Sequence, residues 1–200
     1  MYALYLTHPQ VIVDPGTPVP RWRLSDDGRA RAQRFARAAL ARGIKRMVSS
    51  HETKALETAS ILAAANGAAV EALDGFEEND RSSTGYVPHK RFLQLRETFF
   101  GRPDQSVEGW ESAGHAQRRI VLAAMAVLQG HDAREPIAFV GHGAVGTLLK
   151  CHFGKRSIAM VEDQPDGGGN TFMVRLADLH LISDWMPMES FSAYGVNASR

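Results

Sequence analysis

Short apolar stretches alternate with helical patterns along most of this 200-residue chain, and this alternation constrains the fold more than any other feature. Residues 2–7 (YALYLT), 44–50 (IKRMVSS) and 136–143 (PIAFVGHG) are short, apolar and bounded by turn residues, so we expect strands there. A weaker strand pattern covers 68–73. Helical patterns are found at 24–43, 51–67, about 89–100, 111–130 and 144–154.

Strands separated by helices predict a three-layer α/β sandwich, in which a mostly parallel central sheet carries helices on both faces. Residues 171–185 have the pattern of two final strands with a turn near 177–178, which would form an antiparallel edge. The length suits a single domain over residues 1–200. In such sheets, ligands bind at the carboxyl ends of the strands.

The charge balance excludes several function classes. The chain has 23 Lys and Arg against 22 Asp and Glu, so we expect no binding to nucleic acid or to an anionic membrane. Cys151 is the only cysteine, which precludes an intrachain disulfide, and no apolar run is long enough to cross a membrane. We find no secretion signal and expect a cytoplasmic protein, in which any affinity for an anion comes from a local site.

Three polar features stand at predicted strand ends. His8 ends the first strand, Ser49–Ser50 end the second, and His142 ends PIAFVGHG. If these strands are neighbours, both histidines meet at one edge of the sheet. Gly143 follows His142 and begins a helix, whose free N–H groups suit a phosphate oxygen. Taken singly, each histidine could equally be an ordinary loop residue.

Charged residues lie close to these strand ends in the sequence. Ser50 is the expected N-cap of the helix over 51–67, and Lys54 falls one turn into it, where an anion at the helix start would favour a cation. Glu77 and Glu78 occupy a long loop, and a carboxyl group drawn into a pocket there could donate a proton. The alternatives are a solvated lysine and solvated surface carboxylates.

The order and spacing of these motifs resemble the histidine phosphatase superfamily, with its phosphoglycerate mutase-like fold, over residues 2 to about 176. The resemblance is carried by LYLTH, LSDDGRARAQRFARAAL, VSSHETKALETASILA, LDGFEENDRSSTG, GWESAGHAQRRI and IAFVGHGAVG. It implies phosphoryl transfer through a phosphohistidine on His8. His142 would stabilise the transferring group, and Glu78, favoured over Glu77, would protonate the leaving oxygen and then activate water.

The sequence also departs from the family pattern. The usual Arg-His-Gly is Thr7-His8-Pro9 here, so a bidentate phosphate contact is replaced by one neutral hydroxyl. A second family arginine is Lys54, which keeps the charge and loses the planar fork. We expect Arg81 to supply part of the missing charge, the alternative being a surface arginine paired with Asp80. The resemblance requires no metal or cofactor, and no ligand spacing points to one.

Two functions follow from this pattern. The first is a phosphatase that hydrolyses a small phosphate monoester from a phosphorylated metabolite. The second is a catalytically weak or inactive relative that binds an anion or a partner protein, as the altered Thr-His-Pro motif suggests. Residues of about 79–110 would form a lid or insertion over the site, and their aromatic side chains could frame an apolar or aromatic ester. The sequence does not indicate the oligomeric state.

Overall fold

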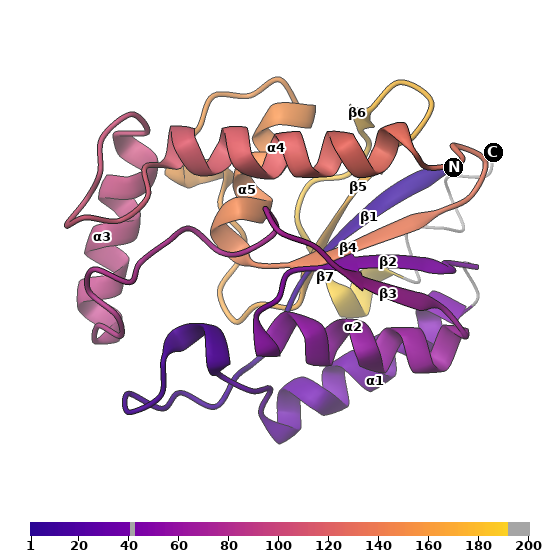
Figure 1. Cartoon of the computed structure of the whole chain (residues 1–200), viewed down its shortest axis with the longest axis horizontal. Coiled ribbons are helices and arrows are strands. Elements are labelled where there is room, and N and C mark those ends of the chain that lie inside the picture. The colour runs from indigo at the N-terminus through magenta and orange to yellow at the C-terminus, as the bar shows by residue number, and fades with distance from the viewer. Residues whose placement is uncertain (41–42, 192–200) are drawn as a thin grey trace.

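The computed structural model of the chain describes residues 1–40 and 43–191 (Figure 1). The α-helices are α1 (Asp26–Leu40), α2 (Thr53–Asn66), α3 (His89–Gly101), α4 (Ala113–Gln129) and α5 (Gly143–Phe153). The strands are β1 (Tyr2–Thr7), β2 (Arg46–Ser49), β3 (Ala69–Ala72), β4 (Ile137–Gly141), β5 (Asn170–Arg175), β6 (His180–Leu181) and β7 (Met186–Pro187). Short 3₁₀ turns occur at η1 (Val19–Arg21), η2 (Met160–Glu162) and η3 (Met188–Ser190). The single domain expected over 1–200 stays a prediction, and it includes residues outside these ranges.

The described strands form one sheet in the order β3-β2-β4-β1-β5-β6, with β7 pairing β5. The pairs β2–β3, β2–β4 and β1–β4 are parallel, and β5 pairs antiparallel with β1, β6 and β7. The predicted mostly parallel α/β sheet is therefore confirmed, with its antiparallel strands at one side. Strand β7 was not predicted, because two residues are too few to show a period.

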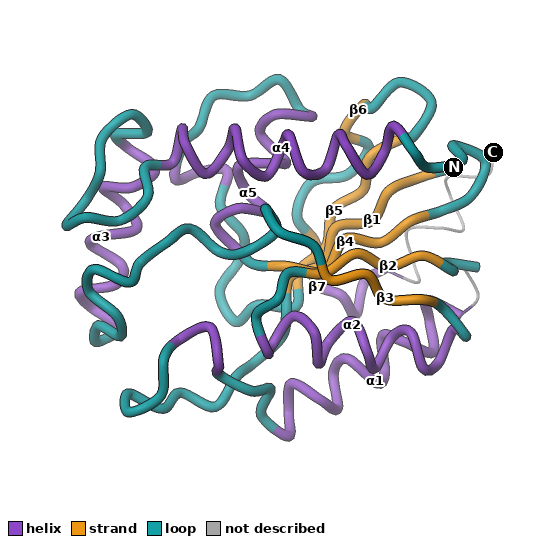
Figure 2. The backbone as a smooth tube through the Cα atoms, viewed as in Figure 1, coloured by secondary structure: helices purple, strands orange, loops and turns teal. Residues whose placement is uncertain are grey.

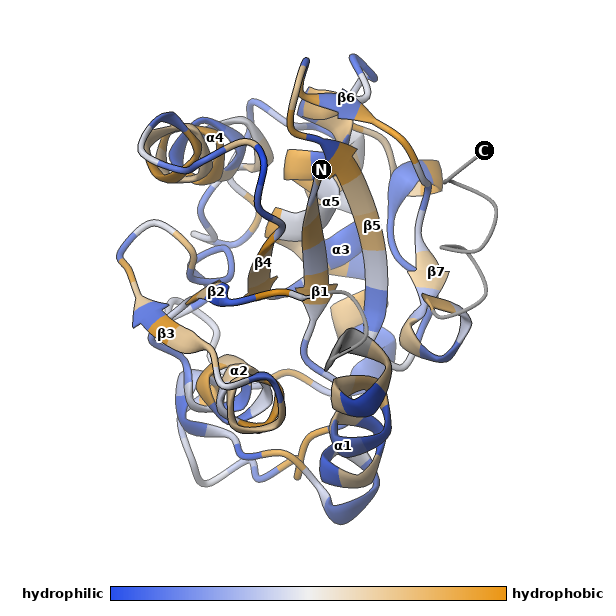
Figure 3. Cartoon of the chain, turned by 90° about the vertical axis from the view of Figure 1, so that its right-hand side faces the viewer, coloured by the Kyte–Doolittle hydropathy of each residue, from blue (hydrophilic) through white to orange (hydrophobic). Residues whose placement is uncertain are grey.

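Alternate residues of each central strand enter different cores, which explains the layers seen in Figure 1. In β1, Ala3 and Tyr5 join a core with residues of α3, α4 and α5, whereas Leu4 and Leu6 join a core with residues of α1 and α2. Figure 3 shows the sheet between α4 on one side and α1 with α2 on the other. Both faces of the sheet are thus covered by helices, as is usual when parallel strands are buried.

Helix ends agree with the sequence in two places and differ in a third. The Ser25 hydroxyl accepts a hydrogen bond from the Gly28 amide at the start of α1, and Gly67 ends α2 with a φ of +57°. The expected N-cap at Ser50 is wrong, because α2 begins at Thr53 with Glu52 as its N-cap residue. The Ser50 hydroxyl instead contacts the imidazole of His142.

The order of the strands places β4 between β1 and β2, so the ends that carry His142, His8 and Ser49 are neighbours. The loops over 8–25 and 73–88 gather at this end of the molecule (Figure 2). Within the described ranges, no helix has the length and apolar character that a membrane crossing requires.

Candidate active site

His8 lies immediately after β1. Its ring Nδ1 is 2.8 Å from the carbonyl oxygen of Pro9. A carbonyl only accepts, so Nδ1 carries the proton and Nε2 holds a lone pair. Burial of the ring and the nearby Lys54 ammonium lower the pKa of His8 to about 4. The imidazole is therefore neutral near pH 7, and its Nε2 is available as a nucleophile.

His142 is fully buried between β4 and α5, and its ring centroid lies 5.4 Å from that of His8 in an edge-to-face arrangement. The Tyr5 phenol fixes its backbone by accepting from the His142 N–H (3.1 Å) and donating to its carbonyl (3.0 Å). Its Nε2 is 2.7 Å from the Ser50 hydroxyl. The structure thus brings together the two histidines and Ser50.

Close packing explains the glycines around His142. A Cβ on Gly141 would lie 2.5 Å from the Tyr5 hydroxyl, and one on Gly143 would lie 2.1 Å from the Gln164 amide nitrogen. The sequence argument had assigned the room beside these glycines to a ligand. In the structure, the side chains of Tyr5 and Gln164 use that room, although Gly143 also lines the cavity described below.

Lys54 is buried and already paired. Its ammonium donates to the carboxylate of Glu52 and to the carbonyl of Val19 (3.0 Å). Burial alone would raise the pKa of Glu52, but the Lys54 ammonium and the hydrogen bonds from Lys54 and from the Glu78 amide lower it. Glu52 is thus an anion at neutral pH, and the charge of Lys54 is locally compensated.

Glu78 and Glu77, adjacent in sequence, point to different surroundings. The Glu78 carboxylate accepts hydrogen bonds from the amides of Ala144 (3.3 Å) and Val145 (3.1 Å) at the start of α5. The Glu77 carboxylate accepts from the Gly75 amide (2.8 Å) and does not line the cavity that His8 lines. Of this pair, Glu78 alone lines the cavity that His8 lines, and the choice of Glu78 as the acid stays a prediction.

Arg81 turns inward. Its guanidinium carbon lies 5.2 Å from the centroid of the Phe92 ring and 5.5 Å from that of Trp110, and one nitrogen is 4.0 Å from Glu78. Asp80, the alternative partner, instead accepts from the Ser82 amide (2.8 Å). Arg81 lines the same cavity as His8 and Lys54, so a second cation is present there.

Thr7 does not face the cavity. Its hydroxyl accepts from the Asn170 amide (2.9 Å) and donates to the Gln164 side-chain oxygen (2.9 Å). These hydrogen bonds tie β1 to the first residue of β5 and to the segment before it. The hydroxyl that the sequence analysis assigned to phosphate is therefore used within the protein, and Gln164 rather than Thr7 lines the cavity.

A cavity of about 340 Å³ opens from these polar groups. Its polar and charged lining residues are His8, Lys54, Glu78, Asn79, Arg81, His89, Arg96, Asp163 and Gln164. The remainder is largely apolar and is lined by Val11, Val13, Val19, Trp22, Tyr86, Val87, Phe92, Phe99 and Trp110. The cavity is therefore built to hold a polar head beside His8 and an apolar body beyond it.

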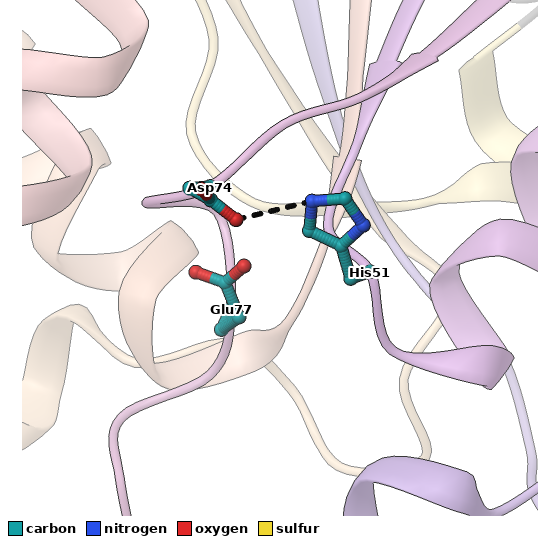
Figure 4. Close-up of side chains that lie close together, drawn as sticks. All are labelled: His51, Asp74 and Glu77. Carbon is teal, nitrogen blue, oxygen red and sulfur yellow. Dashed lines mark ion pairs between the residues drawn. The ribbon is translucent and has the colours of Figure 1, made fainter.

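One group of side chains outside this cavity has ligand atoms close enough to hold a metal ion. His51, Asp74 and Glu77 point toward one another (Figure 4), with His51 Nε2 3.2 Å from Asp74. His51 and Asp74 are exposed, and Arg119 lies 3.8 Å from the Glu77 carboxylate, where it opposes a cation. The cluster shares no residue with the cavity that His8 lines.

Comparison with known families agrees with this geometry. The sequence profile of the histidine phosphatase superfamily (branch 1) matches residues 17–173, which is more than half of the chain. The chain belongs to the histidine phosphatase superfamily. The match starts after His8, so the superfamily assignment does not depend on the altered Thr7-His8-Pro9 motif. No curated protein sequence matches the chain.

Solved structures share the superfamily fold at low sequence identity. A mycobacterial glucosyl-3-phosphoglycerate phosphatase in complex with inorganic phosphate is similar with a TM-score of 0.77 and 18% identity, over 94% of this chain and 98% of that chain. The same phosphatase in complex with VO3 is similar with a TM-score of 0.72 and 20% identity, over 92% of this chain and 96% of that chain. YhfR from Bacillus stearothermophilus is similar with a TM-score of 0.77 and 17% identity, over 90% of this chain and 93% of that chain.

The sequence analysis did not identify three residues of the site. They are Tyr5, which holds the His142 backbone, Gln164, which binds Thr7, and Glu52, which pairs Lys54. Only Glu52 offered a signal, since a carboxylate two residues before a lysine at a helix start can reach it. Tyr5 and Gln164 make contacts with residues more than 130 positions away along the chain, which no local pattern encodes.

Proposed function

We propose that this protein is a phosphatase that hydrolyses small phosphate monoesters through a phosphohistidine on His8. The observation that carries the proposal is the His8 ring, whose Nε2 is left with a lone pair by the bond from Nδ1 to the Pro9 carbonyl. The ring lies beside His142, and its cavity also contains Lys54 and Arg81. A nucleophile next to two cations suits attack on phosphorus.

In the first step, the Nε2 lone pair forms a bond to phosphorus as the ester P–O bond breaks. The leaving oxygen takes a proton from Glu78, and the phosphoryl group stays on His8. In the second step, Glu78 removes a proton from water, whose oxygen attacks phosphorus and breaks the P–N bond, so that inorganic phosphate leaves and His8 is restored. Glu78 lies at the N-terminus of α5, which stabilises the carboxylate that the second step needs.

The groups that would stabilise the charge on the phosphoryl oxygens differ from those that the resemblance implies, because Thr7 and Lys54 stand where the family has two arginines. The phosphoryl oxygens are proposed to contact His142, Lys54, Arg81 and the backbone of Gly143. Arg81 packs over two neighbouring aromatic rings, so its guanidinium is already positioned when substrate arrives. This arrangement would compensate in part for the family arginine that Thr7 replaces. A protein that binds anions without turnover is the second reading, favoured by the pairing of Lys54 with Glu52.

The cavity lining indicates the class of alcohol that the phosphate carries. Trp22 from the loop after β1 packs against Tyr86 from the segment before α3, with ring centroids 5.9 Å apart. With Phe92 and Trp110, these rings form an apolar wall of the cavity. We propose that residues of about 79–110 act as a lid and select monoesters of apolar or aromatic alcohols.

The expected result is a preference for 2-phenylethyl phosphate over glycerol 1-phosphate, two primary alkyl esters with similar leaving groups. The ratio of their kcat/KM values should be about 10- to 100-fold, because the phenyl ring buries apolar area against the wall. Tyr86→Ala should lower this ratio, and Leu122→Ala, an exposed apolar change on α4, should not. Equal kcat/KM values for the two esters would contradict the proposed alcohol class, and no release of inorganic phosphate from either would favour the binding protein.

A further inference from the structure

The buried carboxylate of Glu52 lies against the far side of His142. Its Oε1 is 3.5 Å from His142 Nε2 and accepts a hydrogen bond from the Glu78 amide (2.9 Å). Its side chain is only 8% exposed, and its second oxygen takes the Lys54 ammonium. A buried carboxylate is costly unless it is fully bonded, and Glu52 has a partner on each oxygen.

This carboxylate leaves the site nearly neutral. Lys54 is compensated by Glu52, and Arg81 lies 4.0 Å from Glu78. A phosphoryl group that arrives as a dianion therefore meets a Lys54 ammonium whose charge is already matched by Glu52. Further positive charge is needed to bind it well, and a nearby group able to gain charge is the imidazole of His142.

The two ring nitrogens of His142 have different surroundings. Nε2 contacts the Ser50 hydroxyl at 2.7 Å and lies near Glu52. Nδ1 is fully buried and has no hydrogen-bond partner among the described residues. A buried ring nitrogen without a protein partner can have its bonding completed by a ligand or a water. His142 does not itself line the cavity, but its ring lies edge-to-face with that of His8, which does.

We propose that Glu52 is a positioning residue that lets His142 take up a proton when a tetrahedral dianion binds. In that state Nδ1–H donates to the anion, and Nε2–H is held by Glu52 and Ser50. One proton moves from solvent to the ring, and no other bond changes. The inference rests on the proposed function in one respect, since the anion occupies the same site as the phosphoryl group.

Electrostatics favour protonation of His142 only when both the Glu52 carboxylate and the bound dianion are present. In the free protein, burial lowers the pKa of His142 well below its usual value, Glu52 opposes this, and Lys54, His8 and Arg81 add to it. Glu78, Arg96 and Asp163 also line the cavity and are the other charged groups of the site. A bound dianion places the ring between two negative charges, which raises the pKa of His142 and makes the imidazolium a charged donor.

Calorimetric titration with sulfate tests the inference without requiring turnover. Sulfate remains a dianion near neutral pH, so any proton taken up on binding belongs to the protein. Titrations in two buffers of different ionisation enthalpy should show uptake of about one proton per sulfate near pH 7. Because binding takes up a proton, sulfate affinity should fall as the pH rises, by about tenfold per pH unit where uptake is complete.

Single-residue variants identify the side chain that takes up the proton when sulfate binds. Glu52→Gln should abolish the uptake and weaken sulfate binding about tenfold, although removal of a negative charge beside Lys54 would alone tighten it. His142→Asn should also abolish the uptake, and His8→Asn should retain it. Glu77→Gln, the removal of a carboxylate that does not line the cavity, should behave as wild type.

The outcomes separate this inference from the proposed function. Sulfate binding by the wild-type protein without proton uptake would overturn the role of Glu52 and leave the phosphatase proposal standing. Tighter sulfate binding by Glu52→Gln would show that Glu52 is only a counter-ion of Lys54. Loss of proton uptake in His8→Asn would place the proton on His8 rather than on His142. No sulfate binding at any pH would overturn both proposals.

Discussion

Replacement of His8 by asparagine is expected to lower kcat/KM for phenyl phosphate by on the order of 10⁴-fold. The variant loses the Nε2 lone pair that attacks phosphorus, whereas its side-chain amide can still donate to the Pro9 carbonyl as Nδ1 does. The fold should therefore persist, and the chemical step should fail. Release of inorganic phosphate under saturating and subsaturating substrate measures the effect.

The matched control is His180→Asn, which changes an exposed histidine on β6 outside the site. Its kcat/KM should equal that of the wild type. Thermal unfolding of both variants checks that any loss of activity is not a loss of structure. A His8→Asn protein that folds and retains wild-type activity would remove His8 from the mechanism.

Glu78→Gln is expected to have the second largest effect, a loss of about 10²- to 10⁴-fold in kcat with 2-phenylethyl phosphate. The glutamine amide keeps one acceptor oxygen, so it can still accept from Ala144 or Val145, which bond different oxygens of the native carboxylate. Thermal unfolding of the variant checks that the start of α5 tolerates the loss of one of these bonds. The proton needed by a poor alkoxide leaving group is no longer supplied. Phenyl phosphate, whose leaving group is less basic, should lose less in the first step.

The same variant should reveal the second role of Glu78. With phenyl phosphate, phenol should appear in a burst that matches the enzyme concentration, because the phosphoenzyme forms and then waits for an activated water. Glu77→Gln is the control, since Glu77 bonds the Gly75 amide away from the histidines. A normal rate in Glu78→Gln together with a slow rate in Glu77→Gln would reverse the assignment between the two carboxylates.

The fold could be predicted from the sequence to a large extent because its signals are local. Residues 2–7 have no room for a helix, and Ser25 and Gly67 mark helix ends by side-chain and backbone chemistry that acts within a few residues. The convergence of His8 and His142 also followed from strand ends, once β4 was found between β1 and β2. The Ser50 cap was wrong because α2 begins only at Thr53, so the Ser50 hydroxyl accepts from the Glu52 amide ahead of the helix and also contacts the distant His142.

The detailed contacts of the site could not be predicted in the same way. Thr7 was expected to contact phosphate, but its hydroxyl is satisfied by Asn170 and Gln164, which lie on a segment more than 150 residues further along the chain. The direction of the Arg81 side chain is set by the rings of Phe92 and Trp110, which the sequence places but does not orient. Side-chain direction depends on packing between distant elements, so single motifs cannot fix it.

The central claim is that His8 carries the phosphoryl group, and mass spectrometry of the protein quenched in base during turnover of phenyl phosphate tests it most directly. Base preserves a phosphohistidine, and acid destroys it. We predict one phosphoryl group on the peptide that contains His8, with a larger fraction modified in Glu78→Gln and none after acid treatment. Steady turnover with no phosphoryl group on that peptide, or with the group on another residue, would contradict the claim.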